Sequence, residues 1–204
     1  MTQRRMRLLT VETILDAALV CIDESGQLTM TELAKKLGTT ASSVYHHLDG
    51  RAAIIEALRE RVLSAVELPL MDSSSWDVQI RSWMHSFRHA MAQHPNLIPL
   101  AMEQTITAGR ALVGYDRIAG LLQAAGVAPK HVIVWLSVLE CYALGSALDL
   151  AAPDEAWRVG REDLPTLSNA LELASRGRQR ADEAFELGVD ALLLGLRTRL
   201  EMHR

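Results

Sequence analysis

Residues 29–58, TMTELAKKLGTTASSVYHHLDGRAAIIEAL, predict two short helices joined by a tight glycine turn and followed at once by a third helix. The first helix has an apolar stripe at spacings of three and four, formed by Leu33, Ala34 and Leu37. Thr29 followed by Glu32 is a capping-box pattern that starts this helix. Gly38 follows the last apolar position, where a helix C-cap favours a residue that tolerates positive φ.

The second helix of this unit predicts a surface suited to DNA. Thr40 or Ser42 can cap it, and its buried side is Val44 with Leu48. Its outer side carries hydroxyl, phenol and imidazole groups, which suit phosphates and base edges in a major groove: Ser43, Tyr45, His46 and His47. Two helices around a glycine also occur in all-α proteins that never bind DNA, but a merely solvated face normally carries Glu and Lys. We therefore interpret the unit as a helix-turn-helix.

The composition favours an all-α protein with a sizeable core. The chain has 204 residues, of which 49% are hydrophobic and only 4% aromatic. The sequence shows neither a run of 18 uncharged apolar residues nor a signal-peptide core, so we expect a cytoplasmic protein without a membrane span. Cys21 and Cys141 lie in helical apolar patterns and are expected to be buried thiols.

The charge is distributed unevenly between the two parts of the chain. Residues 1–63 carry eight Lys or Arg and eight Asp or Glu, whereas residues 64–204 carry 13 and 17, which accounts for the net charge of −4. Arg4, Arg5 and Arg7 add a basic arm before the first helix. We expect modest non-specific affinity for DNA and a dependence on dimerisation for tight binding.

Hydrophobic periodicity predicts helices along the whole chain and two domains. Residues 1–50 form the expected helix-turn-helix domain, a helix over 51–68 links the parts, and residues 69–204 form a larger helical domain. The expected helices after the N-terminal 50 residues are 51–68, 76–94, a segment from Pro95 or Pro99 to Gly109, 110–125, 129–152, 165–174 and 181–200, with the charged connector SRGRQR before the last.

Two of these helices are candidates for a dimer interface. The helix over 130–152 is apolar nearly all round, and the helix over 181–200 has a broad apolar face with Gly188 and Gly195 near one side. Burial inside one chain is the alternative use of both surfaces. A 204-residue chain has few other elements to cover them, so we expect a four-helix interface between two copies.

The chain resembles the tetracycline-repressor (TetR) family of regulators. The N-terminal resemblance rests on LTMTELAKKLGTTASSVYHHLDGRAAIIEAL, with Tyr45 in the middle of the recognition helix and the Leu-Asp-Gly-Arg break before the next helix. A looser resemblance covers most of the remaining chain, through WDVQIRSWMHSFRHAM, ALGSALDL and FELGVDALLLGL. The family implies an all-α fold with an N-terminal helix-turn-helix and a larger helical domain, here residues 69–204, for effector binding and dimerisation.

The resemblance also implies roles for individual residues. Tyr45, His47 and Arg51 would hold backbone phosphates, while Ser43 and His46 would face the groove. Partial packing of Tyr45 on the following helix, simple solvent exposure of His46, and a helix-start role for Thr31 are the alternatives. The full set of expected DNA-binding residues is Arg5, Thr31, Thr40, Ser42, Ser43, Tyr45, His46, His47 and Arg51.

The effector expected from the resemblance is a small lipophilic or aromatic molecule. Mostly apolar walls with a few polar groups suit such a ligand, although these residue types are also common in a plain core. The candidate ligand-binding residues are Trp83, Phe87, Met91, Leu100, Glu103, Tyr115, Ile118, Trp135, Leu139 and Tyr142.

We expect neither a metal nor another cofactor. The family's namesake binds a magnesium–tetracycline chelate through asparagine and histidine side chains. This chain retains Phe87, but Trp83 replaces the asparagine and an apolar residue near Leu100 or Ala101 replaces the metal-binding histidine. A trio of His85, His89 and His94 is conceivable, but ordinary surface or pocket histidines are the simpler interpretation.

These observations predict a homodimeric, ligand-responsive transcriptional repressor that binds a palindromic operator and is released by its effector. Its two recognition helices would lie about 34 Å apart, one turn of DNA. A transcriptional activator and a multidrug-sensing regulator of the same fold are the alternatives. An enzyme is disfavoured, because the sequence lacks phosphate-loop, nucleophile-elbow and zinc-binding patterns.

Overall fold

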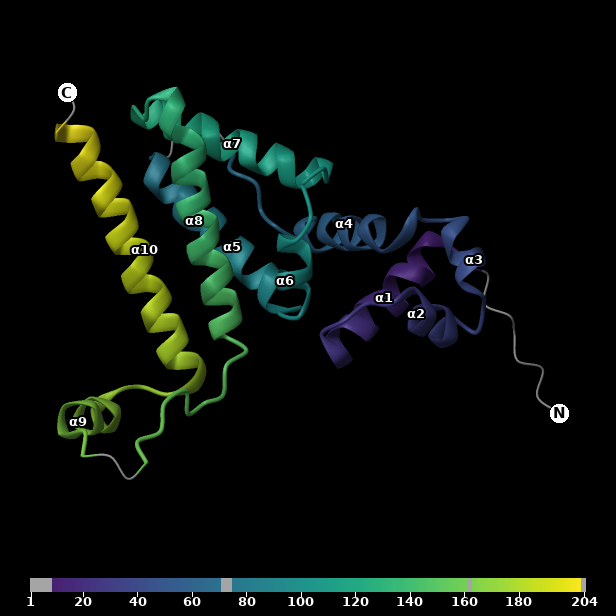
Figure 1. Cartoon of the computed structure of the whole chain (residues 1–204). Helices are drawn as coiled ribbons and strands as arrows, with labels where there is room; N and C mark the ends of the chain where they lie inside the picture. The colour runs from purple at the N-terminus through teal and green to yellow at the C-terminus, as the bar shows by residue number, and fades with distance from the viewer. Residues whose placement is uncertain (1–8, 71–74, 161–162, 203–204) are drawn as a thin grey trace. The chain divides into compact units, whose positions relative to one another are not determined.

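The computed structural model describes residues 9–70, 75–160 and 163–202, and in these ranges it contains ten helices and no strand (Figure 1). The prediction of an all-α fold is therefore confirmed. The chain divides into two compact units. Unit 1 combines residues 1–66 with residues 93–113, and unit 2 combines residues 67–92 with residues 114–204.

Unit 1 contains the predicted helix-turn-helix and the helix that follows it. Its helices are α1 (Val11–Ser25), α2 (Met30–Leu37), α3 (Ala41–Tyr45), α4 (Gly50–Leu63) and α6 (Leu97–Met102). Helix α1 packs against α2, α4 and α6, and α2 packs against α3. Their shared core consists of fully buried aliphatic side chains: Ile14, Ala18, Ile22, Leu33, Val44, Ile54, Ile55, Leu58 and Leu97.

Local capping sets the start and end of α1. The Thr10 side chain accepts a hydrogen bond from the backbone N–H of Thr13 at 3.2 Å, and the Thr13 hydroxyl accepts one from the N–H of Thr10. Gly26 ends the helix in the left-handed region, with φ of 69°. These groups satisfy backbone donors and acceptors that a helix end otherwise leaves unpaired.

Unit 2 is a bundle of longer helices. It contains α5 (Trp76–Ala92), most of α7 (Gly109–Ala125), α8 (Pro129–Asp149), the short α9 (Pro165–Leu173) and α10 (Gly177–Met202). Helix α8 packs against both α5 and α10. The core is formed by their inward faces, including Ile80, Met84, Phe87, Ile118, Leu122, Leu139, Phe185 and Val189.

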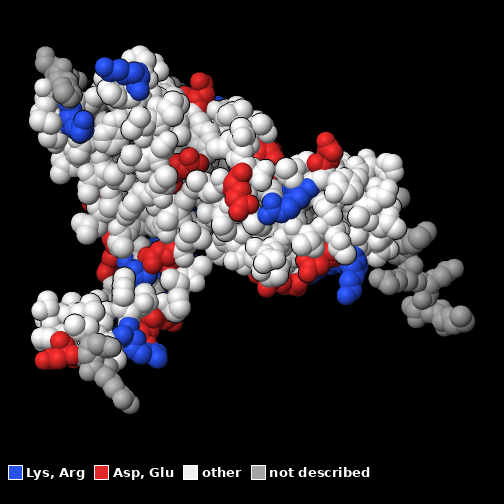
Figure 2. Space-filling model, viewed as in Figure 1, with Lys and Arg blue, Asp and Glu red and all other residues white. Residues whose placement is uncertain are grey.

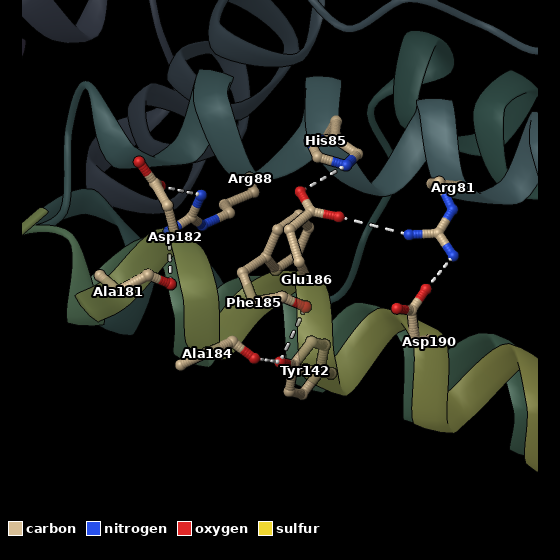
Figure 3. Close-up of polar contacts among 10 residues, drawn as sticks. All are labelled: Arg81, His85, Arg88, Tyr142, Ala181, Asp182, Ala184, Phe185, Glu186 and Asp190. Carbon is tan, nitrogen blue, oxygen red and sulfur yellow. Dashed lines mark hydrogen bonds and ion pairs between the residues drawn. The ribbon is translucent and has the colours of Figure 1, made fainter. Parts of the chain in front are cut away.

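Ion pairs join α5 to α10 along their length (Figure 3). Arg81 pairs with Glu186 and Asp190, His85 with Glu186 at 3.1 Å, and the nearly buried Arg88 with Asp182 at 2.7 Å. The guanidinium of Arg88 also lies over the buried Phe185 ring, 4.5 Å from its centroid. Arg88 therefore makes a cation–π contact with the buried Phe185 ring in addition to its ion pair with Asp182.

Tyr142 of α8 fills the space beside Gly188 on α10. Its ring stacks on Phe185 with centroids 5.9 Å apart, and its hydroxyl donates to the carbonyl of Ala184 at 2.7 Å. Burial raises the pKa of the Tyr142 phenol above its usual value. A Cβ at Gly188 would overlap the Tyr142 hydroxyl. Gly188 thus serves packing within the chain, whereas our prediction used it for approach of a second chain.

Helix boundaries differ from the prediction in two places. The segment predicted to remain helical to Gly109 ends at Met102, before the β-branched run Thr105–Thr107. Helix α10 begins at Gly177, inside the stretch predicted as a connector. Arg180 anchors that early turn, because its guanidinium makes two hydrogen bonds to Asp149 at 2.7 and 3.0 Å.

One expectation about the cysteines is wrong, and one helix is apolar along its length. Cys21 is buried as predicted, whereas Cys141 is exposed on α8. Among the described helices, α8 alone is long and apolar enough to cross a membrane by length and composition, with a mean hydropathy of 1.5. The core helix of a water-soluble protein meets the same criterion.

Substitution of Gly188 by alanine is expected to destabilise the protein. Helix propensity alone would favour alanine by about 1 kcal/mol, but the added methyl must displace the half-buried Tyr142 ring, and overpacking costs about 1–3 kcal/mol. Thermal unfolding of Gly188→Ala should therefore show a lower Tm. Gly109→Ala is the matched control, because a Cβ there meets no atom within 4 Å. Equal Tm values for the two variants would contradict this packing role.

Candidate nucleic-acid interface

The turn between α2 and α3 is built from local hydrogen bonds. The Thr29 side chain accepts from the N–H of Glu32 at 3.2 Å and starts α2. Gly38 ends α2 with φ of 68°, and the N–H of Thr39 donates to the carbonyl of Ala34 at 3.0 Å. A left-handed residue at this position reverses the chain without steric cost only if it is glycine.

Thr40, and not Ser42, caps α3. Its side-chain oxygen accepts from the N–H of Ser43 at 3.2 Å and lies 2.9 Å from the Ser43 hydroxyl. Val44 is fully buried against the rest of unit 1 and fixes the rotation of this short helix about its axis. The cap and the buried valine together decide which side chains α3 presents to solvent.

Three of the four side chains predicted for the outer side are exposed, and the fourth, Ser43, is half-buried. Tyr45 is 51% exposed, and His46 and His47 are exposed where α3 ends. Residues 38–48 contain no Lys, Arg, Asp or Glu, and the surface at the position of α3 is uncharged on the face shown in Figure 2. The result is an exposed polar surface that carries both hydrogen-bond donors and hydrogen-bond acceptors.

The other predicted residues lie at different places around α3. Ser42 is exposed on α3, whereas Ser43 is half-buried, and Thr31 is exposed in the first turn of α2. Thr31 thus lies one residue beyond Met30, where α2 begins, and the capping role belongs to Thr29. Arg5 lies outside the described residues.

Tyr45 is held from one side by Gly50. Gly50 begins α4 with φ of 80°, and a Cβ at this position would lie 3.3 Å from Cε1 of Tyr45. Positive φ and the close approach both favour glycine here. The Leu-Asp-Gly-Arg break therefore sets the position of the Tyr45 ring as well as the start of α4.

Arg51 is tied to its own unit in the structure. Its Nε donates to the carbonyl of Leu28 at 3.2 Å, and its Nη2 lies 3.8 Å from Oε2 of Glu103. The side chain is still 38% exposed. Glu103, which we predicted as a ligand-binding residue, is the C-cap of α6 and is exposed.

Helix α4 is also hydrogen-bonded to the segment between α6 and α7 through side chains that were not predicted from the sequence. Arg59, only 5% exposed, donates to the carbonyls of Ala101 and Gln104. Its Nη1 lies 3.3 Å from the Glu56 carboxylate, which accepts from the backbone N–H of Thr107. The Glu56 carboxylate accepts further from the Thr107 hydroxyl and the N–H of Ala108, and Glu60 accepts from the N–H of Arg110 at 2.9 Å.

The residue pattern of α4 contains one indication of these hydrogen bonds. Ile55, Leu58 and Val62 form an apolar stripe, and Arg59 lies beside that stripe. A long cation on a buried helix face requires hydrogen-bond acceptors nearby. Sequence periodicity cannot identify those acceptors, because here they are backbone carbonyls about 40 residues away, at Ala101 and Gln104.

The candidate ligand-binding residues do not all belong to one unit. Eight lie in unit 2, whereas Leu100 and Glu103 lie in unit 1. Trp83 and Phe87 are buried neighbours with ring centroids 5.1 Å apart, and Tyr115 donates to Glu140. The side chains of six of these residues are buried: Trp83, Phe87, Met91, Leu100, Ile118 and Leu139. Trp135, Tyr115 and Tyr142 are half-buried.

None of these ten residues lines either of two open hollows in the described residues. One, of about 520 Å³ in unit 1, is lined by α4 and the α6–α7 segment, including Ala53, Glu56 and Thr107. The other, of about 360 Å³ in unit 2, is lined by Trp157, Arg180 and residues of α9. Among the described residues, no group of three or more His, Cys, Asp or Glu is arranged to hold a metal ion.

Comparison with known proteins identifies the family. The model of bacterial regulatory proteins of the tetR family matches residues 14–58, and the tetracyclin repressor-like C-terminal domain matches residues 68–200. This chain belongs to the tetracycline-repressor family. The resemblance stated from the sequence is therefore confirmed.

Individual relatives agree with this assignment. The chain is 28% identical over 178 residues to an HTH-type transcriptional regulator of Saccharopolyspora erythraea, covering 86% of this chain and 73% of that protein. It is 26% identical to the class G tetracycline repressor protein of Vibrio anguillarum, covering 90% and 91%. The fold is also that of Streptomyces coelicolor ActR in complex with actinorhodin, with a TM-score of 0.76, 22% identity and coverage of 95% and 99%.

Membership confirms the predicted function class, a ligand-responsive DNA-binding transcriptional repressor. Proteins of this family bind DNA operators and small-molecule effectors. The N-terminal family match ends at residue 58, within α4, and it contains the whole α2–α3 unit.

Substitution of Gly50 by alanine is expected to cost more stability than the same change at Gly26. Both glycines have positive φ, at 80° and 69°, and alanine in that region costs about 1–2 kcal/mol. Only Gly50 adds a close contact, with Tyr45. Chemical denaturation should therefore give a lower free energy of unfolding for Gly50→Ala than for Gly26→Ala. Equal losses would mean that the Tyr45 ring moves away freely.

Proposed function

We propose that this protein is a homodimeric repressor that places one α3 from each copy in successive major grooves of a palindromic operator. The observation that carries the proposal is the exposed surface of α3, which holds hydroxyl, phenol and imidazole groups and no charged side chain. Such groups are typical of base-edge and phosphate contacts. Regulators of this kind act on chromosomal DNA, so we place the protein in the cytoplasm.

Residue roles follow from where each side chain lies. Tyr45 and His47 are exposed and close to the end of α3, which suits contacts to phosphates on one side of the groove. Ser42 on α3 and His46 at its C-cap are exposed and are the proposed base-edge contacts, with Ser43 and Thr40 as partners that share a hydrogen bond.

Residues outside α3 complete the proposed contact set. Thr31, exposed at the start of α2, and Arg51, exposed in part at the start of α4, would each meet a phosphate. The basic N-terminal arm that contains Arg5 would add charge. Most protein–DNA hydrogen bonds of this kind position the protein, and the few base contacts specify the sequence.

The proposed dimer interface is formed by α8 and α10. Each helix has an exposed apolar stripe at helical spacing, which comprises Val134, Val138, Cys141, Gly145 and Leu148 on α8 and Leu187, Ala191, Leu194 and Gly195 on α10. A Cβ at Gly145 or Gly195 would meet no atom within 4 Å, so both positions are open to a close neighbour. Contiguous apolar surface of this kind marks an interaction site, and a second copy would cover it symmetrically.

The proposed effector site lies among the side chains of α5 and α8 around Trp83, Phe87 and Tyr142. These aromatic side chains and their aliphatic neighbours suit a small lipophilic or aromatic molecule. The signal would reach α3 through α4, because Arg59 and Glu56 fix α4 to the segment that links α6 and α7. A coupling of about 1–3 kcal/mol changes operator affinity five- to 150-fold.

Replacement of the proposed phosphate contacts tests DNA binding directly. The variants Tyr45→Phe and His47→Ala should weaken operator binding at least tenfold each, because both copies in the dimer lose a contact to DNA. Fluorescence anisotropy with an operator duplex, and with a scrambled duplex of equal length, measures the change. His131→Ala, on the exposed start of α8, is the control and should bind as the unchanged protein does. Equal binding of both duplexes by the unchanged protein would refute the proposed function.

A charge on α10 tests the proposed interface. Leu194 is 63% exposed in the single chain, so Leu194→Glu should preserve the fold and place a carboxylate where the second copy would bury it. Light scattering after size-exclusion chromatography should then report a monomer. Leu173→Glu, at a residue of α9 that is 80% exposed, is the matched control and should remain dimeric. A dimeric Leu194→Glu variant would exclude this face of α10.

A further inference from the structure

One ion pair links a proposed DNA contact to the α6–α7 segment. Nη2 of Arg51 at the start of α4 lies 3.8 Å from Oε2 of Glu103, and both residues belong to unit 1. Arg51 is oriented for this contact, since its Nε donates to the carbonyl of Leu28 at 3.2 Å. The side chains are 38% and 62% exposed, so water and other anions can reach the pair.

The backbone near Glu103 is fixed to the helix that carries Arg51. Before Glu103, the carbonyl of Ala101 accepts from Arg59 of α4. After it, the carbonyl of Gln104 accepts from Arg59 at 3.3 Å, and the N–H of Thr107 donates to Glu56 of α4. Anchors on both sides hold the Glu103 backbone beside α4, so less conformational entropy is lost when the pair forms.

A carboxylate and a phosphate are alternative partners for one guanidinium. The carboxylate is planar and the phosphate is tetrahedral, and both accept charge-assisted hydrogen bonds from arginine. Glu103 also places a negative charge next to the position that a DNA phosphate would take at Arg51, and like charges repel. A phosphate at Arg51 would therefore compete with Glu103 for the same guanidinium.

We propose that Glu103 is an autoinhibitory competitor that lowers operator affinity by occupying Arg51 in the DNA-free protein. This inference rests on the proposed function, in which Arg51 meets a phosphate. Because Glu103 caps α6, any movement of the α6–α7 segment toward or away from Arg51 changes the strength of the competition. The DNA-binding unit thus contains its own affinity control.

The expected size of the effect is modest because the pair is exposed. Exposed ion pairs have strengths that correspond to about a two- to fivefold change in equilibrium. Two copies in the dimer would multiply this to about four- to 25-fold in operator affinity.

The test is a double-mutant cycle with Glu103→Gln and Arg51→Gln, read by anisotropy of a labelled operator duplex. Glu103→Gln should tighten operator binding about four- to 25-fold in the otherwise unchanged protein, and should have no such effect in the Arg51→Gln background. The Arg51→Gln background separates competition at Arg51 from a general effect of removing a negative charge. A general charge effect would tighten binding equally with and without Arg51.

The other outcomes overturn the inference. Equal tightening in both backgrounds would show a general charge effect, and unchanged or weaker binding by Glu103→Gln would show that no competition occurs. Unchanged binding by Arg51→Gln, while Tyr45→Phe still weakens binding, would exclude Arg51 as a phosphate contact and leave the proposed function intact. Absence of operator preference in the unchanged protein would instead mean that the proposed function has failed.

A swapped pair guards against loss of fold in Arg51→Gln. The double variant Arg51→Glu with Glu103→Arg keeps opposite charges at the two positions but, like Arg51→Gln, lacks the guanidinium that donates to the carbonyl of Leu28. Its Tm should therefore be no lower than that of Arg51→Gln. Its operator affinity should fall below that of Arg51→Gln, because it places a carboxylate at the proposed phosphate position. Tighter binding by the swapped variant than by Arg51→Gln would contradict the proposal.

Discussion

The buried guanidinium of Arg59 is the interaction on which the N-terminal unit depends most. An arginine that is only 5% exposed must find acceptors, and here they are the carbonyls at the end of α6 and the carboxylate of Glu56. Removal of one partner of such a buried group typically costs about 3–5 kcal/mol. The contact therefore fixes where α6 ends and holds α4 to residues distant in sequence.

The DNA-reading element is stable only through its surroundings. Helix α3 has five residues, far fewer than the length at which an isolated helix forms in water. The Thr40 cap, the buried Val44 and the approach of Gly50 to Tyr45 supply what the helix lacks. Because these supports are polar caps and one buried side chain, the outer surface of α3 is free to carry residues chosen for recognition.

The helix-turn-helix was predictable because its determinants are local. Gly38, Thr29 and Thr40 act on backbone groups within four or five residues, so their roles can be inferred from spacing alone. The early start of α10 was not predictable, because it depends on the contact between Arg180 and Asp149 across 31 positions. The role of Gly188 likewise depends on Tyr142, which no local pattern connects to it.

The same contrast applies to the candidate site. Exposure of Tyr45, His46 and His47 followed from the apolar side of α3, whereas the partners of Arg51 and Arg59 required the folded chain.

The proposed DNA-contact surface contains few permanent positive charges. Residues 38–48 contain no permanent cation, so among the described residues of the proposed contact set only Arg51 is charged at every physiological pH. Where few cations neutralise phosphates, one carboxylate beside Arg51 weakens the electrostatic attraction by a modest but measurable factor, and the affinity for DNA becomes sensitive to where the α6–α7 segment lies.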